Sequence, residues 1–189
     1  MKYKAHDYQQ YATEFIIGHP VSCLILDMGL GKTVITLTAL WLLLFDYFEV
    51  RRILVIAPKR VAETTWSAEI KKWEHLYGMT FAVAMGTAEQ RKEALLSGAD
   101  VTIIGRDNVS WMTKNIFFDF DMVIIDELSS FKSSKAQRFR ALKKVRKYIK
   151  RIVGLTGTPS PNGLLDLWPE MYLLDEGKAL GKTLTGYRD

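Results

Sequence analysis

Cysteine and long hydrophobic runs are both scarce in this sequence. Cys23 is the only cysteine among 189 residues, so an internal disulfide and a cysteine-held metal cluster are excluded. The longest apolar stretch, residues 34–45, is shorter than the roughly 20 residues that span a bilayer. The first residues are polar and no signal-peptide segment follows them. We therefore expect one ordinary domain in a reducing cytoplasm, with no membrane partner.

Acidic residues are absent from residues 132–151, a segment that holds ten of the 26 lysines and arginines. The rest of the chain carries 16 basic and 21 acidic residues, so this segment accounts for the net charge of +5. Its apolar residues recur at helical spacing, which predicts a helix at 134–150 with a cationic outer face. Arg138, Lys143 and Lys147 on that face suit a polyanion such as nucleic acid. The alternative is an ordinary solvated helix surface.

The most informative stretch begins with a short apolar run at residues 21–26. Two glycines follow, and then Lys32 and Thr33 open a long apolar segment. Gly29 and Gly31 have no Cβ atom, so the backbone there can approach a polyphosphate closely. The N–H groups after the second glycine would lie at a helix N-terminus, where unpaired donors and the helix dipole favour an anion. Strand, glycine loop and helix together predict a phosphate-binding loop.

This loop has the parts that ATP and Mg²⁺ require. Lys32 would reach the β- and γ-phosphates, and the Thr33 hydroxyl would ligate Mg²⁺. The backbone of Gly29, Leu30 and Gly31 would surround the phosphates.

The tripeptide Gly-Lys-Thr also occurs at residues 181–183, which provides an internal comparison. No apolar strand precedes that second copy, and only a short polar tail follows it. Its context therefore favours an ordinary helix start, whereas the first copy predicts a nucleotide site. The first copy departs from the general pattern at one position, because Leu26 stands where a further glycine is usual.

Apolar runs and helical periodicity alternate along the chain, which predicts an α/β fold. We expect a mostly parallel central sheet with helices on both faces, and ligands at the carboxyl ends of its strands. Lys32, Asp126 and Thr156 all follow such ends. The predicted strands are 21–26, 53–57, 81–85, 101–104, 122–125 and 152–155, and the predicted helices are 3–17, 33–48, 61–76, 88–96, 107–114, 134–150 and 164–174.

Two of these elements carry predictions about burial. The apolar run at 21–26 is interpreted as a buried strand. The spacing of apolar residues in the first helix places Tyr8, Tyr11, Ala12 and Phe15 on its inward face.

Two carboxylates, Asp126 and Glu127, follow the apolar run at 122–125. An ATPase needs one carboxylate to hold Mg²⁺, and a second one can polarise the attacking water. The alternative is a strand that simply ends in acidic residues at the surface. Behind a phosphate-binding loop, the pair predicts a catalytic site.

Five motifs occur in the order found in superfamily-two helicase motors: Gln9 and residues 27–33, 56–58, 126–127 and 155–159. The residues within these motifs most resemble those of the Swi/Snf branch, which consists of double-stranded-DNA translocases. That branch also has a tryptophan soon after Ala-Pro, comparable to Trp66 and Trp73. Its Thr-Gly-Thr-Pro is followed by Asn and Leu-x-x-Leu-Trp, as at Asn162 and residues 164–168.

The resemblance implies a function for the whole chain. Residues 1–189 would form the first RecA-like lobe of a two-lobe motor, with the P-loop fold of that class. The motor would hydrolyse Mg-ATP and translocate on double-stranded DNA once this lobe is joined to a second RecA-like lobe in the same or a longer chain.

The resemblance also implies roles for single residues. Gln9 would read the adenine edge, Asp126 would coordinate Mg²⁺, and Glu127 would activate water. In the DNA-facing part the implied residues are Lys59 and Arg60, which would touch the backbone, and Thr156 and Thr158, which would link the DNA to the nucleotide.

Three departures from the family pattern bear on function. Ser129 stands where the family has a histidine that couples ATP to DNA, and residues 103–106 lack the usual tyrosine. Nothing after Thr158 resembles a second lobe, which in this family supplies the arginine finger and half of the DNA groove. We therefore expect this chain alone to hydrolyse ATP weakly. The early adenine motif suggests a small phage or bacterial protein.

Two other classes of protein are alternatives. A non-catalytic nucleic-acid-binding module could keep the fold without hydrolysis, but it has no reason to retain Lys32, Thr33, Asp126 and Glu127 together. A P-loop kinase or small GTPase would explain neither the Thr-Gly-Thr-Pro motif nor the cationic helix.

Overall fold

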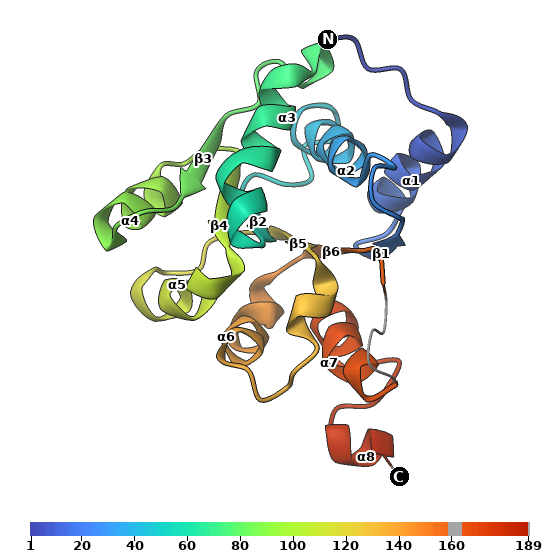
Figure 1. The fold of residues 1–189 in the computed structure, drawn as a ribbon, viewed down its shortest axis with the longest axis vertical. Helices are drawn as coiled ribbons and strands as arrows, with labels where there is room; N and C mark the ends of the chain where they lie inside the picture. The colour runs from blue at the N-terminus through green and yellow to red at the C-terminus, as the bar shows by residue number, and fades with distance from the viewer. Residues whose placement is uncertain (159–163, 189) are drawn as a thin grey trace.

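A computed structural model describes residues 1–158 and 164–188 and has a six-stranded, wholly parallel sheet at its centre (Figure 1). The strand order is β1-β6-β5-β2-β4-β3. This confirms the predicted α/β fold with a parallel sheet. The strands are β1 (Val21–Ile25), β2 (Ile53–Ala57), β3 (Phe81–Ala84), β4 (Val101–Gly105), β5 (Met122–Asp126) and β6 (Arg151–Thr156).

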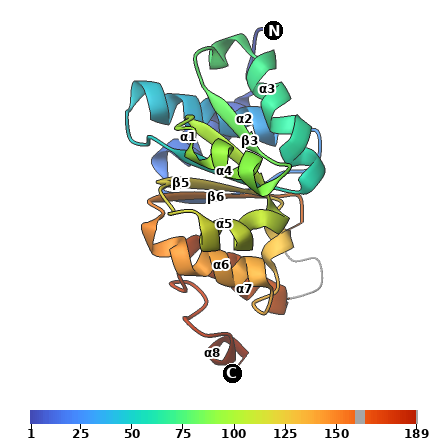
Figure 2. The same ribbon diagram turned by 90° about the vertical axis from the view of Figure 1, so that its left-hand side faces the viewer.

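Helices cover both faces of the sheet, as Figures 1 and 2 show. One face carries α1 (Asp7–Gly18), α2 (Lys32–Trp41) and α3 (Trp66–Lys72), and the other carries α5 (Val109–Asn115), α6 (Gln137–Val145) and α7 (Leu164–Asp175). The remaining helices are α4 (Ala88–Leu96), next to β3, and α8 (Leu184–Arg188), beyond α7. All residues of β2, β4 and β6 are buried, because apolar side chains of both helical layers pack against them.

The prediction of a buried first strand is wrong in part, because β1 lies at an edge of the sheet. Ser22 and Leu24 are buried on the face covered by α1, but Val21 is 39% exposed and Ile25 is 54% exposed. An edge strand has a neighbour on one side only, so its outer residues can remain in contact with solvent.

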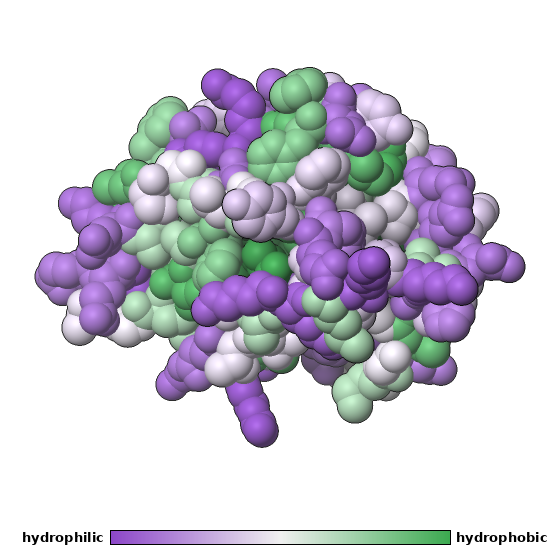
Figure 3. All heavy atoms as spheres, turned by 90° about the horizontal axis from the view of Figure 1, so that it is seen from above, coloured by the Kyte–Doolittle hydropathy of each residue, from purple (hydrophilic) through white to green (hydrophobic). Residues whose placement is uncertain are grey.

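The predicted inward face of α1 is also wrong in part. Tyr8 and Tyr11 are exposed, whereas Gln9, Thr13 and Ile16 are buried with Ala12. Polar side chains lie inward here because they have partners: the Thr13 hydroxyl donates to the Gln9 carbonyl at 3.0 Å. Seen from above, the surface of the molecule has several hydrophobic areas interspersed with hydrophilic side chains (Figure 3).

Two predicted helices contain π-helical turns, at Leu42–Asp46 and at Val61–Thr65. The predicted helix at 61–76 also ends early, because Trp73 adopts an extended backbone (φ −96°, ψ 124°) after α3. Turns of this kind are frequent at functional sites, and the second one directly precedes Trp66.

The ten basic residues of the 132–151 segment do not form one outer face. Arg146 is buried, and its guanidinium donates to the carbonyls of Leu173, Leu174 and Ile149. Arg151 is buried as well and donates to the carbonyls of Ile16 and Ile17, at the end of α1. Each arginine satisfies carbonyls that a helix end leaves unpaired, so two of the ten charges stabilise the fold instead of facing solvent.

Glu170 on α7 is a buried carboxyl group, with 1% of the residue exposed. Its Oε1 atom has no hydrogen-bond partner among the described residues. Burial raises the pKa of Glu170 to about 8, with a further increase from Asp166 and an opposing effect of Lys132. The side chain therefore keeps its proton near neutral pH.

This raised pKa predicts a pH-dependent loss of stability. Between the ordinary pKa of 4.5 and the folded pKa of about 8, the folded chain holds a proton that the unfolded chain releases, so stability falls as pH rises. Glu170→Gln removes this dependence. Between pH 6 and pH 8, we expect the unfolding free energy of wild type to fall by about 2 kcal/mol more than that of the variant. Urea unfolding at both pH values measures this difference. An exposed-site control, Glu93→Gln, should keep the pH dependence of wild type. Parallel pH profiles of wild type and Glu170→Gln would contradict the prediction.

Candidate nucleotide and nucleic-acid site

Three neighbouring strands bring the predicted catalytic residues together at the carboxyl end of the sheet. β1, β6 and β5 lie side by side, Ile25 pairs with Thr156, and Leu155 pairs with Asp126. The chain leaving β1 continues this contact, because the Leu26 N–H donates to the Thr156 carbonyl at 3.1 Å. The carboxyl ends of parallel strands are where α/β folds bind ligands, and the phosphate-loop motif follows β1 there.

The glycine loop has the backbone that its sequence predicts. Gly29 and Gly31 have φ values of 81° and 82°, a backbone conformation that residues with a Cβ atom rarely adopt. Gly31 also leaves room for a neighbour, because a Cβ there would lie 2.6 Å from Nε2 of Gln9. Gly29 is therefore required for the turn, and Gly31 is required both for the turn and for the close contact with α1.

Gln9 lies against this loop. Its Nε2 donates to the Leu30 carbonyl at 3.3 Å, and its Oε1 accepts from the His6 N–H at 3.0 Å. The Tyr8 hydroxyl donates to the same Leu30 carbonyl at 2.9 Å. The start of α1 is thus joined to the loop by two side chains, one of which, Tyr8, the sequence placed in the core.

Lys32 and Thr33 open α2 immediately after the loop. The Lys32 ammonium group donates to the carbonyls of Leu26 and Asp27 and forms no ion pair with a described residue. Its positive charge is therefore not neutralised and is available to an anion at the loop.

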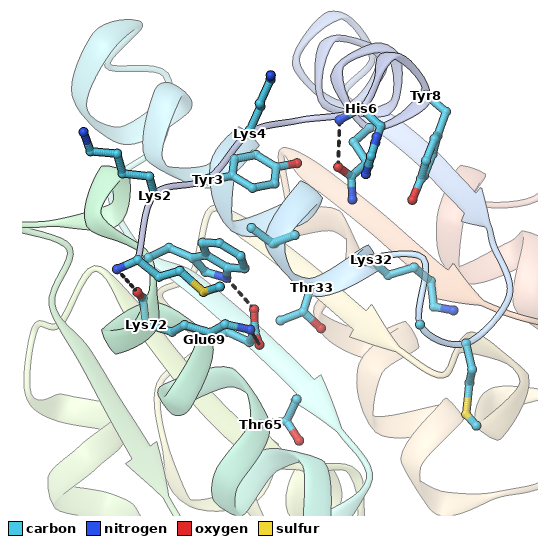
Figure 4. A pocket seen from close by; sticks show the side chains of 17 residues that line it. Lys2, Tyr3, Lys4, His6, Tyr8, Lys32, Thr33, Thr65, Glu69 and Lys72 are labelled. Atoms are coloured by element: carbon cyan, nitrogen blue, oxygen red, sulfur yellow. Dashed lines mark hydrogen bonds and ion pairs between the residues drawn. The ribbon is translucent and has the colours of Figure 1, made fainter.

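A cavity of about 660 Å³ lies beside the loop (Figure 4). Thr33 and Thr65 point toward it from α2 and from the segment before α3. The charged side chains among its lining are those of Lys2, Lys4, Lys32, Lys72 and Glu69. With four lysines and one carboxylate, the cavity has the charge and size for a nucleotide polyphosphate. Thr65, Glu69, Lys72 and the two N-terminal lysines were not predicted from the sequence, since no motif includes them.

Asp126 and Glu127 lie outside the lining of this cavity, at the carboxyl end of β5. Asp126 accepts a hydrogen bond at Oδ2 from the indole Nε1 of Trp66, at 2.9 Å. Burial raises the pKa of Asp126, and the negative charge of Glu127 raises it further. The Trp66 hydrogen bond, the Lys32 charge and the backbone N–H of Glu127 lower this pKa. The Lys32 contribution links this carboxylate electrostatically to the phosphate loop.

Glu127 has a left-handed backbone (φ 63°) and an exposed side chain. Few residues other than glycine adopt this conformation, which frequently occurs at functional sites. The Ser129 hydroxyl donates to Oε1 of Glu127 at 3.1 Å. The residue that replaces the family's histidine therefore contacts the second carboxylate of the pair.

Thr156 and Thr158 form a small turn at the end of β6. The Thr156 hydroxyl donates to the Thr158 carbonyl at 2.9 Å, and the Thr158 N–H donates to that hydroxyl oxygen at 3.1 Å. Two residues that contributed to the family resemblance, Pro159 and Asn162, lie outside the described residues.

Lys59 and Arg60 are exposed just beyond β2, at the same carboxyl end of the sheet. Lys59 lines a second cavity of about 300 Å³ together with Glu63, Arg91 and Asp107. Neither Lys59 nor Arg60 forms an ion pair within residues 1–158 or 164–188. Two exposed cations therefore stand beside a hollow at the carboxyl ends of β2 and β4.

The three cations named on the predicted helix at 134–150 have different environments. Arg138 approaches Asp107 at 3.6 Å, so the first turn of α6 adjoins the second cavity. The Lys143 ammonium group lies 4.3 Å from the ring centre of Tyr172, and that of Lys147 lies 5.1 Å from the ring centre of Tyr148. Cations over aromatic rings keep their charge, so both lysines still contribute to a positive surface.

The residues present fit Mg²⁺ held together with a nucleotide. The described residues contain no group of three or more His, Cys, Asp or Glu side chains that could hold a metal ion alone. Mg²⁺ usually takes one or two protein oxygens and completes its shell with phosphate oxygens and water. The Thr33 hydroxyl and the Asp126 carboxylate are oxygen ligands of this kind.

Among residues 1–158 and 164–188, every helix is too short or too polar to span a bilayer.

Comparison with known proteins identifies relatives of this arrangement. The chain matches the family model of the SNF2-related domain over residues 8–184. It is 41% identical over 168 residues to protein p41 of Acyrthosiphon pisum secondary endosymbiont phage 1, covering 85% of this chain and 36% of p41. It is 26% identical over 197 residues to helicase swr1 of Aspergillus fumigatus, covering 97% of this chain and 11% of that helicase.

The fold is similar to that of the Sulfolobus solfataricus SWI2/SNF2 ATPase core, solved in complex with dsDNA. The TM-score is 0.83 and the sequence identity is 25%, with 100% of this chain and 39% of that chain covered. The chain thus spans well under half of the length of these relatives.

Proposed function

Because this chain belongs to the SNF2-related domain family of helicase ATPases, we propose that it is the Mg-ATP-binding lobe of a double-stranded-DNA translocase. One observation carries the proposal: the glycine loop, Lys32, Asp126 and Glu127 all lie at the carboxyl ends of neighbouring parallel strands. The lobe would translocate on DNA when joined to a second RecA-like lobe, and it would act in the cytoplasm of a bacterium or a phage-infected host.

The residues of the site suit phosphoryl transfer to water. Lys32 would exchange its carbonyl partners for β- and γ-phosphate oxygens, and Thr33 and Asp126 would hold Mg²⁺. Bound Mg²⁺ would neutralise charge that develops on the phosphate oxygens. Glu127 would orient the attacking water, with Ser129 limiting the rotation of its side chain. Gln9 would stay at the loop and contact the adenine edge.

The second half of the proposal concerns DNA. Lys59 and Arg60 would bind the duplex backbone, since they are exposed at the same carboxyl end of the sheet as the nucleotide site. Thr156 and Thr158 would connect the two ligands, because Thr156 pairs with the strand that leads into the phosphate loop. Arg138 and Lys143 of α6, with Lys147 just beyond its end, would add a weaker contact to the polyanion. Equilibrium binding of Mg-ADP tests the first half of the proposal, and duplex binding tests the second.

We expect duplex binding to be independent of sequence and steeply dependent on salt, because phosphate contacts release counterions. Lys59→Glu with Arg60→Glu should flatten the slope of log affinity against log salt by about 2, since each lost contact removes about 0.9. The triple change of Arg138, Lys143 and Lys147 to Glu should flatten it less, because Arg138 already lies near Asp107. Fluorescence anisotropy of a labelled duplex over a salt series measures these slopes.

A matched variant separates local contacts from total charge. Lys92→Glu with Lys178→Glu reverses two exposed lysines that line neither cavity, and it should leave the slope near that of wild type. An equal effect of this control pair would refute a localised duplex site. An unchanged slope in the triple variant would make α6 an ordinary solvated surface.

A further inference from the structure

Trp66 is a fully buried tryptophan whose only polar atom meets the carboxylate assigned to Mg²⁺. The residue is 0% exposed, and its Nε1 donates to Oδ2 of Asp126 at 2.9 Å across 60 positions of sequence. An indole N–H that lies in a core requires an acceptor, and a charged acceptor gives a stronger bond than a carbonyl. Here that acceptor is a half-buried carboxylate at the end of β5.

The helical segment that carries Trp66 borders the nucleotide cavity on one side and the second cavity on the other. Thr65, Glu69 and Lys72 line the first, and Lys59 and Glu63 line the second. The π-helical turn at Val61–Thr65 directly precedes Trp66, and Ala62, Trp66 and Ile70 are the buried residues of the segment. The indole therefore reaches Asp126 from a packed helical segment between the two cavities.

A carboxylate that binds a metal needs a fixed orientation, since each of its oxygens can rotate into or out of the metal's reach. Partners in the second coordination shell supply that orientation in metal sites generally. For Asp126, the Trp66 indole and the backbone N–H of Glu127 are hydrogen-bond donors to the carboxylate, and Trp66 is the only side chain among the described residues that donates to it.

We propose that Trp66 is a positioning residue, which orients the Asp126 carboxylate toward nucleotide-bound Mg²⁺. This inference rests on the proposed function, because it requires that Asp126 be a metal ligand. It assigns to Trp66 a role that packing alone would not require, since a phenyl ring fills most of the same space without a donor.

The test is a Mg²⁺ titration of the 189-residue chain at a fixed concentration of fluorescent ADP analogue. Trp66→Phe keeps an aromatic ring in the core and removes the N–H. We expect its half-saturating Mg²⁺ concentration to rise about 10-fold or more, as is usual when a partner of a metal ligand is lost. Nucleotide binding in EDTA should change less than 2-fold relative to wild type, because the loop and Lys32 are untouched.

Trp168→Phe is the matched control. Trp168 is also buried (3% exposed), and its Nε1 donates to the Gly181 carbonyl at 3.0 Å, so this variant loses an indole hydrogen bond of similar length. It should lower thermal stability while keeping the wild-type Mg²⁺ midpoint. If Trp66→Phe does not fold by circular dichroism, 3-benzothienylalanine at position 66 keeps the shape of tryptophan and replaces N–H by sulfur.

The outcomes distinguish this inference from the function on which it rests. A wild-type midpoint in the Trp66 variant, with nucleotide bound normally, would overturn the positioning role and leave the ATP site in place. Equal midpoint shifts in the Trp66 and Trp168 variants would also overturn it, because general loosening of the core would then explain both. A wild-type chain that bound no nucleotide would refute the proposed function itself.

Discussion

Joining a second lobe to this chain should raise ATP turnover in the presence of duplex DNA by on the order of 10³- to 10⁵-fold. The transition state of phosphoryl transfer spreads negative charge over the γ-phosphoryl oxygens. Lys32 and Mg²⁺ would neutralise that charge from one side only. An arginine finger supplied by a partner is worth this factor in related enzymes.

The arginines of the described residues are engaged elsewhere or lie apart from the site. None of them lines the nucleotide cavity. Arg146 and Arg151 are bonded to helix-end carbonyls. Arg52 lies 4.7 Å from the ring centre of Phe120, and Arg91 lies 4.3 Å from that of Trp111. The finger is therefore expected from outside this lobe.

The measurement compares steady-state turnover of residues 1–189 with that of a longer chain, or of this chain with an added second lobe. Each is assayed with and without duplex DNA. Glu127→Gln in the longer chain is the control, and it should abolish the stimulated rate because the water-orienting carboxylate is lost. Robust, DNA-stimulated turnover by residues 1–189, lost in Glu127→Gln, would show that the lobe is complete in itself.

Lys32→Ala should weaken ADP and ATP binding by about 2 to 4 kcal/mol, which corresponds to about 30- to 1,000-fold. The variant removes a charge-assisted contact to the phosphates, and no other cation occupies the first turn of α2. The folded chain should tolerate the change, since Lys32 bonds only to loop carbonyls near the surface. Isothermal titration and the nucleotide-induced rise in thermal midpoint both measure the loss.

The second Gly-Lys-Thr supplies the control for this experiment. Lys182 is exposed, precedes a helix of five residues, and lies outside the nucleotide cavity. Lys182→Ala should therefore bind nucleotide as wild type does. Equal binding by wild type and Lys32→Ala would exclude the glycine loop as the phosphate site.

Local features of the fold could be predicted because they depend on residues close together in sequence. Gly29 and Gly31 adopt positive φ values that few other residues would tolerate, so a loop was predictable there. The apolar runs that form β2 and β5 are buried on both faces and needed no partner to be recognised. The resemblance to the Swi/Snf branch rested on the order of the motifs, and the match to the SNF2-related domain confirms that resemblance.

Burial was less predictable wherever it depended on which element lies alongside. Tyr8 and Tyr11 satisfy the spacing of an inward face, yet the residues that α1 buries are Gln9, Ala12, Thr13 and Ile16. Hydrogen-bond partners make such polar positions tolerable inside, and those partners are not readable from one helix alone. Likewise, Val21 and Ile25 remain exposed because strand order puts β1 at the edge.

The sequence by itself determined the α/β class, the glycine loop after β1 and the pair of carboxylates after an apolar strand, because each is encoded by spacing within a few residues. Only the tertiary structure decided that Arg146 and Arg151 turn inward, and that Trp66 meets Asp126 across 60 positions. The physical reason is that a side-chain donor binds whichever unpaired acceptor the packed elements bring within about 3 Å. Helix-end carbonyls and a strand-end carboxylate become such acceptors only after the sheet has set its strand order.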